Sequence, residues 1–549
     1  MNRRSPSPTE QAVRGNVVDL LAGRIWPGEL VIVDGRIAAR RPLAGRCATW
    51  LLPGFIDAHV HVESSMLTPP EFARAAVVHG TVATVSDPHE IANVLGEQGV
   101  QYMLQCAAGV PLKFYFGAPS CVPATQFETA GAALDHAAVA RLLDDPRIHY
   151  LSEMMNVPGV LAGDPEVLAK ITAARERGKP VDGHAPGLRG AQAAAYLAAG
   201  ISTDHECLSA DEAREKIAHG ARILIRQGSA ARNFEALCCL VDEYPEACMF
   251  CSDDKHPDEL LEGHINLLLR QGVARGFNLM HLLRVACLNP VRHYGLDVGL
   301  LREGDPADFI EVDSLTEFRV LRTFLAGQLA AEDGQACFAA PPCPTRNRFA
   351  ARLLKAVDFR VPADSQRIRV IQAVDGELVT RASVEQASIL AGAAAPDTAR
   401  DLLKLAVVNR YHDTAPAVAF IRGFGLKHGA LASSVAHDCH NIVAVGSNDE
   451  DLCQAVNLVI QQQGGLAVAA GPTGDVLPLP VAGLMSTGPC PEVARHYARL
   501  DGLARQLGCT LRAPFMTLSF MALLVIPELK LSDRGLFDGR DFALVPLFV

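Results

Sequence analysis

The sequence lacks the features of a membrane-spanning, exported or nucleic-acid-binding protein. Its longest apolar runs, such as residues 518–527, are too short to cross a bilayer, which takes about 20 residues. Positive charge is not in excess: 50 Lys and Arg face 61 Asp and Glu, for a net charge of −11. This balance argues against non-specific binding to nucleic acid or anionic membranes. The basic residues 3–4 precede a polar segment, not the apolar stretch of a signal peptide. We therefore expect a cytoplasmic protein with a small-molecule ligand.

The sequence also shows no disulfide framework. Its 15 cysteines are odd in number and irregularly spaced, which predicts reduced thiols. Cys248 and Cys251 have the spacing of half a zinc knuckle. Residues three apart on a strand face opposite sides, so we do not expect a zinc site there. Without repeats or low-complexity segments, a chain of 549 residues predicts about two to four globular domains.

Short β-like runs alternate with helical segments from residue 51 to 295, as in parallel β/α units. Eight strands are expected, at residues 52–59, 81–86, 113–117, 148–153, 180–184, 200–205, 222–227 and 247–253. Eight units in this length predict an α/β fold, a closed (β/α)8 TIM-type barrel. The alternative, an open doubly wound sheet, would call for a glycine-rich phosphate turn after the first strand, and none is present.

The segments on either side of the barrel have a different pattern. Residues 17–37 alternate apolar positions with expected turns at Pro27-Gly28 and Asp34-Gly35, and residues 300–330 resume this style. We expect residues 1–50 and 296–345 to pair into one small composite β-sandwich domain in which the barrel, residues 51–295, is inserted. A Pro-rich linker at 337–344 leads to a C-terminal α+β domain, residues 346–549.

Metal-binding side chains end most of the predicted barrel strands. They are His59, His61, Asp87, His89, Glu90, Glu153, His184, His205, Asp253 and Asp254. Catalytic groups of such barrels lie at the carboxyl ends of the strands, and His and carboxylate suit divalent ions. Four histidines with two carboxylates exceed what one tetrahedral ion needs, which favours two ions that share a bridging carboxylate and a bridging hydroxide.

This pattern resembles the amidohydrolase superfamily, in which a carboxylated lysine on the fourth strand often bridges the metals. Here Glu153 occupies that place. With this departure, the sequence is similar to the bacterial adenine deaminases over nearly its whole length. The motifs that carry the similarity are residues 57–65, 87–90, 152–159, 228–233, 251–257, 514–521 and 527–530. The resemblance implies hydrolysis of adenine to hypoxanthine and ammonia, a reaction of purine salvage.

The resemblance also implies roles for individual residues. His59, His61, Glu153 and Asp253 would hold one ion, and Glu153, His184 and His205 the other. Glu153 and Asp253 would be catalytic, with Asp253 moving the proton from water to the leaving amine; its alternative is a helix N-cap. The expected substrate-binding residues are Asp254, Glu90, His89, Arg232 and Asn233. Asp254 is as readily a loop cap, His89 and Glu90 could instead bind an extra ion, and Arg232 could be a solvated surface residue. The family favours Mn²⁺ or Fe²⁺, and Zn²⁺ is also compatible with these ligands.

A second histidine cluster, at residues 437–441, lies in the C-terminal region. Because the barrel already supplies a full ligand set, we expect a structural or interface role for it. A third domain and an acidic composition are compatible with a homo-oligomer, a dimer or larger. The competing functions are a cyclic amide hydrolase of the same superfamily, such as a dihydroorotase or hydantoinase, and a non-catalytic metal-binding scaffold. The first would normally use the bridging lysine, and the second would have lost ligands.

Overall fold

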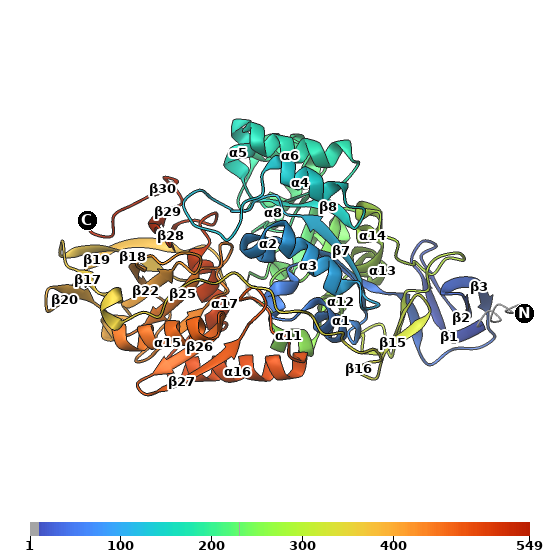
Figure 1. Ribbon diagram of the computed structural model, residues 1–549. Coiled ribbons are helices and arrows are strands. Elements are labelled where there is room, and N and C mark those ends of the chain that lie inside the picture. Colours follow the sequence, from blue (N-terminus) through green and yellow to red (C-terminus); the bar gives the residue numbers. More distant parts are fainter. Residues whose placement is uncertain (1–9, 230) are drawn as a thin grey trace, which may run out of the picture.

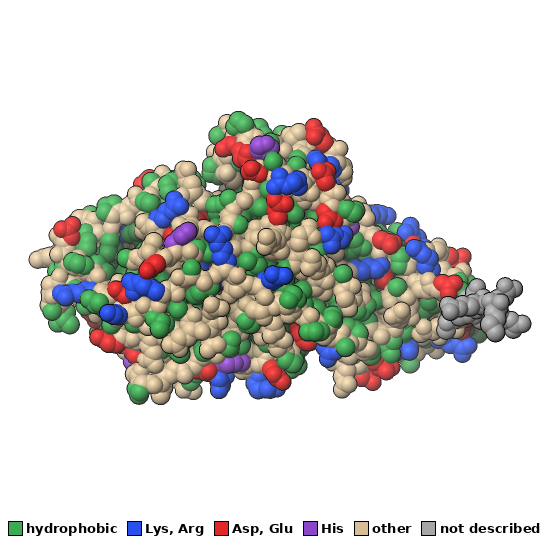
Figure 2. Space-filling model, in the orientation of Figure 1, with side chains coloured by type: hydrophobic (Ala, Val, Ile, Leu, Met, Phe, Trp, Pro, Cys, Tyr) green, Lys and Arg blue, Asp and Glu red, His purple; other side chains and the backbone are tan. Residues whose placement is uncertain are grey.

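The protein is elongated, with a β-sheet domain at one end, a barrel in the middle and a mixed domain at the other end (Figure 1). The computed structural model describes residues 10–229 and 231–549. Residues 1–9, which include the basic amino end, and residue 230 lie outside the described residues. Acidic and basic side chains are interspersed over the face in Figure 2. Within the described residues, no helix is both long and apolar enough to cross a membrane.

The flanks of the barrel meet in one eight-stranded sheet of order β16-β15-β14-β13-β4-β1-β2-β3. Its strands are β1 (Glu10–Asp19), β2 (Arg24–Val33), β3 (Arg36–Pro42), β4 (Trp50–Pro53), β13 (Phe309–Val312), β14 (Val320–Leu325), β15 (Gln328–Glu332) and β16 (Gln335–Ala336). The turn predicted at Asp34-Gly35 is confirmed. The turn predicted at Pro27-Gly28 is wrong, because both residues lie within β2 and pair with β1. The chain turns instead at residues 20–23, where Gly23 adopts a φ of 64° that suits glycine.

The first predicted barrel strand, residues 52–59, is divided in the structure. Its beginning belongs to β4, which pairs with β1 and β13 in the outer sheet. Its remainder forms β5 (Phe55–Val60), the first strand of the barrel. Gly54 joins the two, and a Cβ there would lie 2.2 Å from Cγ1 of Val82. The bare backbone at this position lets the chain pass closely from one sheet into the other.

The eight parallel strands of the barrel follow at the predicted places. They are β5, β6 (Thr81–Ser86), β7 (Lys113–Ala118), β8 (Ile148–Met154), β9 (Val181–Gly183), β10 (Thr203–Asp204), β11 (Arg222–Arg226) and β12 (Cys248–Cys251). The strands β5 to β9 form one ladder and β10 to β12 another. Ser202 N donates to Val181 O at 2.8 Å, and Asp253 N donates to His59 O at 2.9 Å. These bonds join the two ladders on both sides and close the barrel.

Helices surround the barrel and bury the apolar outer faces of its strands. The longer ones are α1 (Pro69–Val77), α3 (Glu97–Ala107), α4 (His136–Asp144), α6 (Pro165–Glu176), α7 (Gly190–Ala198), α8 (Ala210–Ala218) and α12 (Ile265–Ala274). Asp135, Asp164 and Ser209 accept hydrogen bonds from the first-turn amides of α4, α6 and α8. These caps satisfy amide donors that a helix leaves free at its start.

The C-terminal domain is built on a second eight-stranded sheet, of order β19-β18-β23-β22-β25-β24-β26-β27. Its strands are β18 (Arg367–Gln372), β19 (Arg381–Gln386), β22 (Leu403–Val408), β23 (Ala417–Arg422), β24 (Ala430–Ser433), β25 (Ile442–Gly446), β26 (Gly465–Ala470) and β27 (Thr473–Pro478). Helix α15 (Asp449–Gln461) packs its apolar side on this sheet. The domain is completed by α16 (Cys490–Gln506), α17 (Pro514–Ser519) and the hairpin of β28 (Leu529–Ser532) and β29 (Gly535–Asp538).

This domain is docked firmly on the barrel. One continuous apolar core includes residues of both, such as Met66 of the barrel and Met485 of the C-terminal domain. At its edge, Tyr497 of α16 contacts the His256 ring, with Oη 2.6 Å from Nδ1. His256 follows β12 by a few residues, so the C-terminal domain rests on the loops at the carboxyl ends of the barrel strands.

Candidate metal centre

Glu153, near the end of β8, is the centre of a buried cluster of imidazoles. Its Oε1 lies 3.3 Å from His61 Nε2, 3.9 Å from His59 Nε2 and 3.5 Å from His89 Nδ1. Its Oε2 lies 2.6 Å from His184 Nδ1 and 3.2 Å from His205 Nε2. Each carboxylate oxygen therefore faces its own group of histidines, the arrangement expected of a carboxylate between two cation sites.

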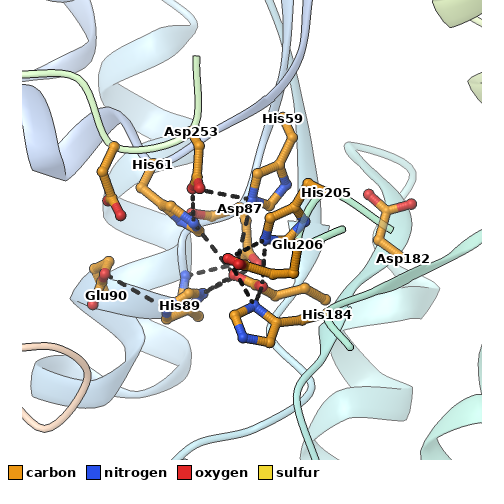
Figure 3. A network of polar contacts seen from close by, with 12 residues as sticks. His59, His61, Asp87, His89, Glu90, Asp182, His184, His205, Glu206 and Asp253 are labelled. Atoms are coloured by element: carbon orange, nitrogen blue, oxygen red, sulfur yellow. Dashed lines mark hydrogen bonds and ion pairs between the residues drawn. The ribbon is translucent and has the colours of Figure 1, made fainter. Parts of the chain in front are cut away.

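These rings are placed by the ends of the barrel strands and by the alternation of side chains along a strand. His59 and His61 stand two residues apart at the end of β5 and therefore project to the same side of the strand. His184 and His205 each follow directly after a strand, β9 and β10. Figure 3 shows the rings of these four histidines turned toward one point. All four are buried.

Asp253 completes the group around the first two histidines. Its Oδ1 lies 3.2 Å from His61 Nε2 and 3.5 Å from His59 Nε2. Its backbone adopts a φ of 54°, in the left-handed region, which carries a cost for a residue with a side chain. Hydrogen bonds to the carbonyl of His59 and from the amide of His61 hold it there. The alternative role for Asp253 was that of a helix N-cap. The next helix, α11 (Pro257–Glu262), has His256 and not Asp253 as its N-cap.

The donor set fits divalent ions. Both ring nitrogens of His59 and Nε2 of His184 are buried with no hydrogen-bond partner among the described residues. Such orphaned polar atoms are costly unless another ligand satisfies them. His61 Nδ1 donates to the carbonyl oxygen of Asp87 at 3.1 Å, which fixes the ring and leaves Nε2 as the atom that would bind a metal. His and carboxylate groups also gather in several sets of at least three within metal-binding reach of one another.

The local charges keep the carboxylates ionised. Burial alone would raise the pKa of Glu153, but the imidazoles of His205 and His184 outweigh it and hold the pKa well below the usual range. Burial likewise opposes ionisation of Asp253, and Arg226 with the two neighbouring histidines holds its pKa well below normal. Ionised carboxylates are the form that binds cations.

Two supporting residues, Arg226 and Glu206, were missed by the sequence analysis. The Arg226 guanidinium donates to both Glu206 oxygens, at 2.5 and 3.0 Å, and also to Asp253 Oδ2. Glu206 Oε1 in turn lies 3.7 Å from His184 Nδ1 and 3.5 Å from His205 Nε2. Their positions could have indicated a place in the site, since Arg226 ends the seventh strand and Glu206 follows His205. Neither Arg nor Glu at such a position identifies a site residue by itself.

The predicted substrate-binding residues fall into two groups. His89, Glu90 and Asp254 line the same small cavity as the metal-binding side chains. Arg232 does not line this cavity: it pairs with Glu259 at 2.7 Å and is partly exposed. Asn233 binds backbone instead, since its amide group contacts the amide of Arg226 and the carbonyl of His205. Asn233 thus ties two barrel strand ends together.

The second histidine cluster lies at the interface between the barrel and the C-terminal domain, and it also reaches the cavity. His437 Nδ1 and His440 Nε2 both contact the carboxylate of Glu90, and Asp438 Oδ1 lies 3.7 Å from His89 Nε2. The C-terminal domain therefore supplies polar groups to the wall of the site. The sequence gives no sign of this contribution, because the two domains are patterned separately along the chain. Cys248 and Cys251 both lie within β12 and are buried.

The cavity between the two domains is small. Its volume is about 20 Å³, room for about one water molecule. Its apolar wall consists of Met155 from the barrel and Leu378, Phe520 and Leu523 from the C-terminal domain.

Comparisons with known proteins cover the whole chain. The model of the Amidohydrolase family matches residues 50–330, and that of the Adenine deaminase C-terminal domain matches residues 377–543. A Salinibacter ruber protein named adenine deaminase is 58% identical over 99% of this chain and 100% of its own length. Proteins of the same name from Methanosarcina barkeri and Borreliella burgdorferi are 52% and 43% identical, over 98% and 97% of this chain and 99% of each relative.

Proposed function

This chain belongs to the adenine deaminase family of the amidohydrolases, and we propose that it hydrolyses adenine to hypoxanthine and ammonia, a step of purine salvage. In this reaction the oxygen of water bonds to C6 of the purine. The bond between C6 and the exocyclic nitrogen then breaks, and that nitrogen leaves as ammonia after it gains a proton.

The observation that carries the proposal is the position of Glu153. Its two oxygens face two separate groups of buried histidines, within 2.6 to 3.9 Å. A carboxylate here, in place of the lysine usual in cyclic amide hydrolases of the superfamily, accompanies a full ligand set and a C-terminal domain of the adenine deaminase type. A scaffold that had lost its chemistry would not be expected to retain all of these groups.

Two divalent ions would be held here, one by His59, His61, Glu153 and Asp253, and the other by Glu153, His184 and His205. When bound, they supply the Lewis acidity that turns water into a nucleophile near neutral pH. The family resemblance favours Mn²⁺ or Fe²⁺, and the ligand types suit Zn²⁺ equally.

Asp253 is the proton carrier in this proposal. Its carboxylate is ionised and fixed between Arg226 and the two β5 histidines, so it can accept a proton from the attacking water. It then returns the proton to the departing nitrogen, as a general base and acid in turn. Asp254, the next residue, lines the cavity and accepts a hydrogen bond from Ser64 Oγ at 2.5 Å. This contact orients its carboxyl group for the purine.

Ammonia release from adenine, adenosine and dihydroorotate by metal-loaded protein tests the function. We expect release from adenine, and its loss in Asp253→Asn with metal content retained. Release from dihydroorotate alone would favour a cyclic amide hydrolase, and release from none would favour a scaffold.

A homo-oligomer in a reducing compartment such as the cytoplasm is our expectation for the cellular form. All fifteen cysteines lie in the described part of the chain and are free thiols, which suits a reducing compartment. Ile389 and Leu390 of β20 (Ser388–Leu390) are 47% and 73% exposed, and exposed apolar side chains of this kind suit a contact with a second copy. Light scattering of purified protein would give the assembly size.

A further inference from the structure

His437 of the C-terminal domain has a buried ring that is only partly hydrogen-bonded. It is buried in the wall of the metal-site cavity, 3% exposed. Its Nδ1 is bonded to Glu90 Oε1, while its Nε2 has no hydrogen-bond partner among the described residues. A buried nitrogen left unpaired costs free energy, so a ligand group is expected beside it.

The neighbours of His437 define its hydrogen-bonding state. Glu90 is shared between His437 and His440, whose Nε2 lies 2.5 Å from Glu90 Oε2. The Nδ1 of His440 accepts the Ala436 amide at 3.2 Å, so His440 is neutral and donates through Nε2. Glu90 is thereby an acceptor on both oxygens, which makes His437 Nδ1 a donor. Burial lowers the pKa of His437, but Glu90 and Asp254 outweigh it and raise the pKa to about 9. The ring lies between two carboxylates, bonded to Glu90 through Nδ1 and with Asp254 Oδ1 4.0 Å from Nε2. Two neighbouring carboxylates favour the imidazolium form, in which Nε2 also carries a proton and can donate into the cavity.

An acceptor lies next to this donor. Asp254 Oδ1 is 4.0 Å from His437 Nε2, and both residues line the cavity. The ring of His437 is fixed by stacking on Phe520, with centroids 4.8 Å apart and planes at 17°. The site thus presents a donor beside an acceptor, with His437 on the wall that the C-terminal domain contributes and Glu153 and its histidines on the barrel side.

A purine presents the complementary pair. In free adenine, N3 accepts a hydrogen bond and the adjacent N9–H donates one, and this edge of the ring system lies farthest from C6. When C6 faces the metal-binding side chains, the N3/N9 edge points away from them. Buried polar groups that match such an edge discriminate strongly against analogues that lack it.

We propose that His437 and Asp254 form the purine-recognition pair of the site: His437 Nε2–H donates to N3, and Asp254 accepts the N9–H of the free base. This inference rests on the proposed adenine deamination and extends it to substrate selection. It also gives the C-terminal domain a direct part in binding, since His437 reaches the site only because that domain is docked on the barrel.

The test compares kcat/KM for adenine, 3-deazaadenine and 7-deazaadenine in the wild type and in His437→Phe. The intrinsic reactivity of each base cancels when the variants are compared. A hydrogen bond to a charged donor corresponds to roughly 10- to 100-fold in rate. We expect His437→Phe to reduce the adenine/3-deazaadenine preference by that factor and to leave the adenine/7-deazaadenine ratio unchanged. His412→Phe, an exposed histidine of the same domain, is the matched control and should behave as wild type.

Equal losses on all three bases would show that His437 has only a structural role and would overturn the proposal. If His437→Phe fails to fold or to bind metal, His437→Gln, which keeps an N–H donor, serves instead. It should retain more of the N3 preference than His437→Ala, and equal preferences in these two variants would also overturn the proposal. Asp254→Ala should narrow the gap between adenine and 9-methyladenine. A wild type that deaminates none of the bases refutes the proposed function itself, whereas an active wild type without these changes in preference refutes only the recognition pair.

Discussion

Replacement of Glu153 by Gln is the sharpest single perturbation of the site. Gln keeps the shape of the side chain but removes the negative charge that faces five imidazoles, at 2.6 to 3.9 Å. Loss of one partner from a buried charged group typically costs about 3–5 kcal/mol. If that cost falls on ion binding and on the transition state alike, both the metal affinity and kcat/KM should fall by roughly 10²- to 10³-fold.

The assay is metal content by elemental analysis after dialysis, together with ammonia release from adenine. Glu128→Gln is the matched control, because Glu128 is also buried but binds Thr125 and is not among the partners of the five imidazoles around Glu153. Burial raises the pKa of Glu128 to about 8, so a neutral amide resembles its state near neutral pH. A Glu153→Gln protein that keeps full metal content and wild-type turnover would refute the bridging role.

Three further outcomes follow from the same contacts. Arg226→Lys keeps the positive charge but loses the planar guanidinium that joins Glu206 to Asp253. We therefore expect kcat to fall by roughly 10- to 100-fold while the circular dichroism spectrum stays unchanged. The surface substitution Arg275→Lys is the control and should have no effect. Chelation should abolish ammonia release, and titration with Mn²⁺ or Fe²⁺ should restore it at about two equivalents; full recovery at one equivalent would contradict a two-ion site. Lys530 is buried and its pKa is lowered to about 7 by burial. The unfolded chain therefore binds the extra proton between pH 7 and 10, and wild-type stability relative to Lys530→Met should rise with pH across this window, by up to about 1.4 kcal/mol per pH unit. A flat difference in urea denaturation would show that Lys530 has its ordinary pKa.

Lys530 also links the C-terminal hairpin to the cavity wall. Its Nζ donates to the carbonyls of Leu378 and Phe520, at 2.7 and 2.9 Å, and both of these residues line the cavity. The Lys530→Met variant would remove both contacts to this wall. Its physical effect acts on packing and not on the metal-binding groups.

Local pattern was enough to predict the barrel and the convergence of the side chains that end its strands. Each strand shows as a short apolar run, and parallel strands of a closed barrel bring their carboxyl ends together, so His59 and Asp253 could be assigned to one site without coordinates. The sequence-based predictions that failed also did so for physical reasons. Pro27-Gly28 has turn chemistry yet lies inside β2, because cross-strand pairing there overrides the local preference, and the first predicted strand was divided because two sheets share one apolar run.

The sequence by itself therefore determined which side chains end the barrel strands, since each strand shows as a short local run of apolar residues. The motifs formed by these side chains, through their resemblance to a known family, also determined the class of chemistry. Only the tertiary structure decided what surrounds them. His437 and Glu90 are 347 residues apart in the chain and meet because an entire domain docks over the strand ends. Arg232, in contrast, lies near the site in sequence but pairs with Glu259. Such contacts depend on how two separately patterned cores pack together, and no local spacing of residues encodes that arrangement.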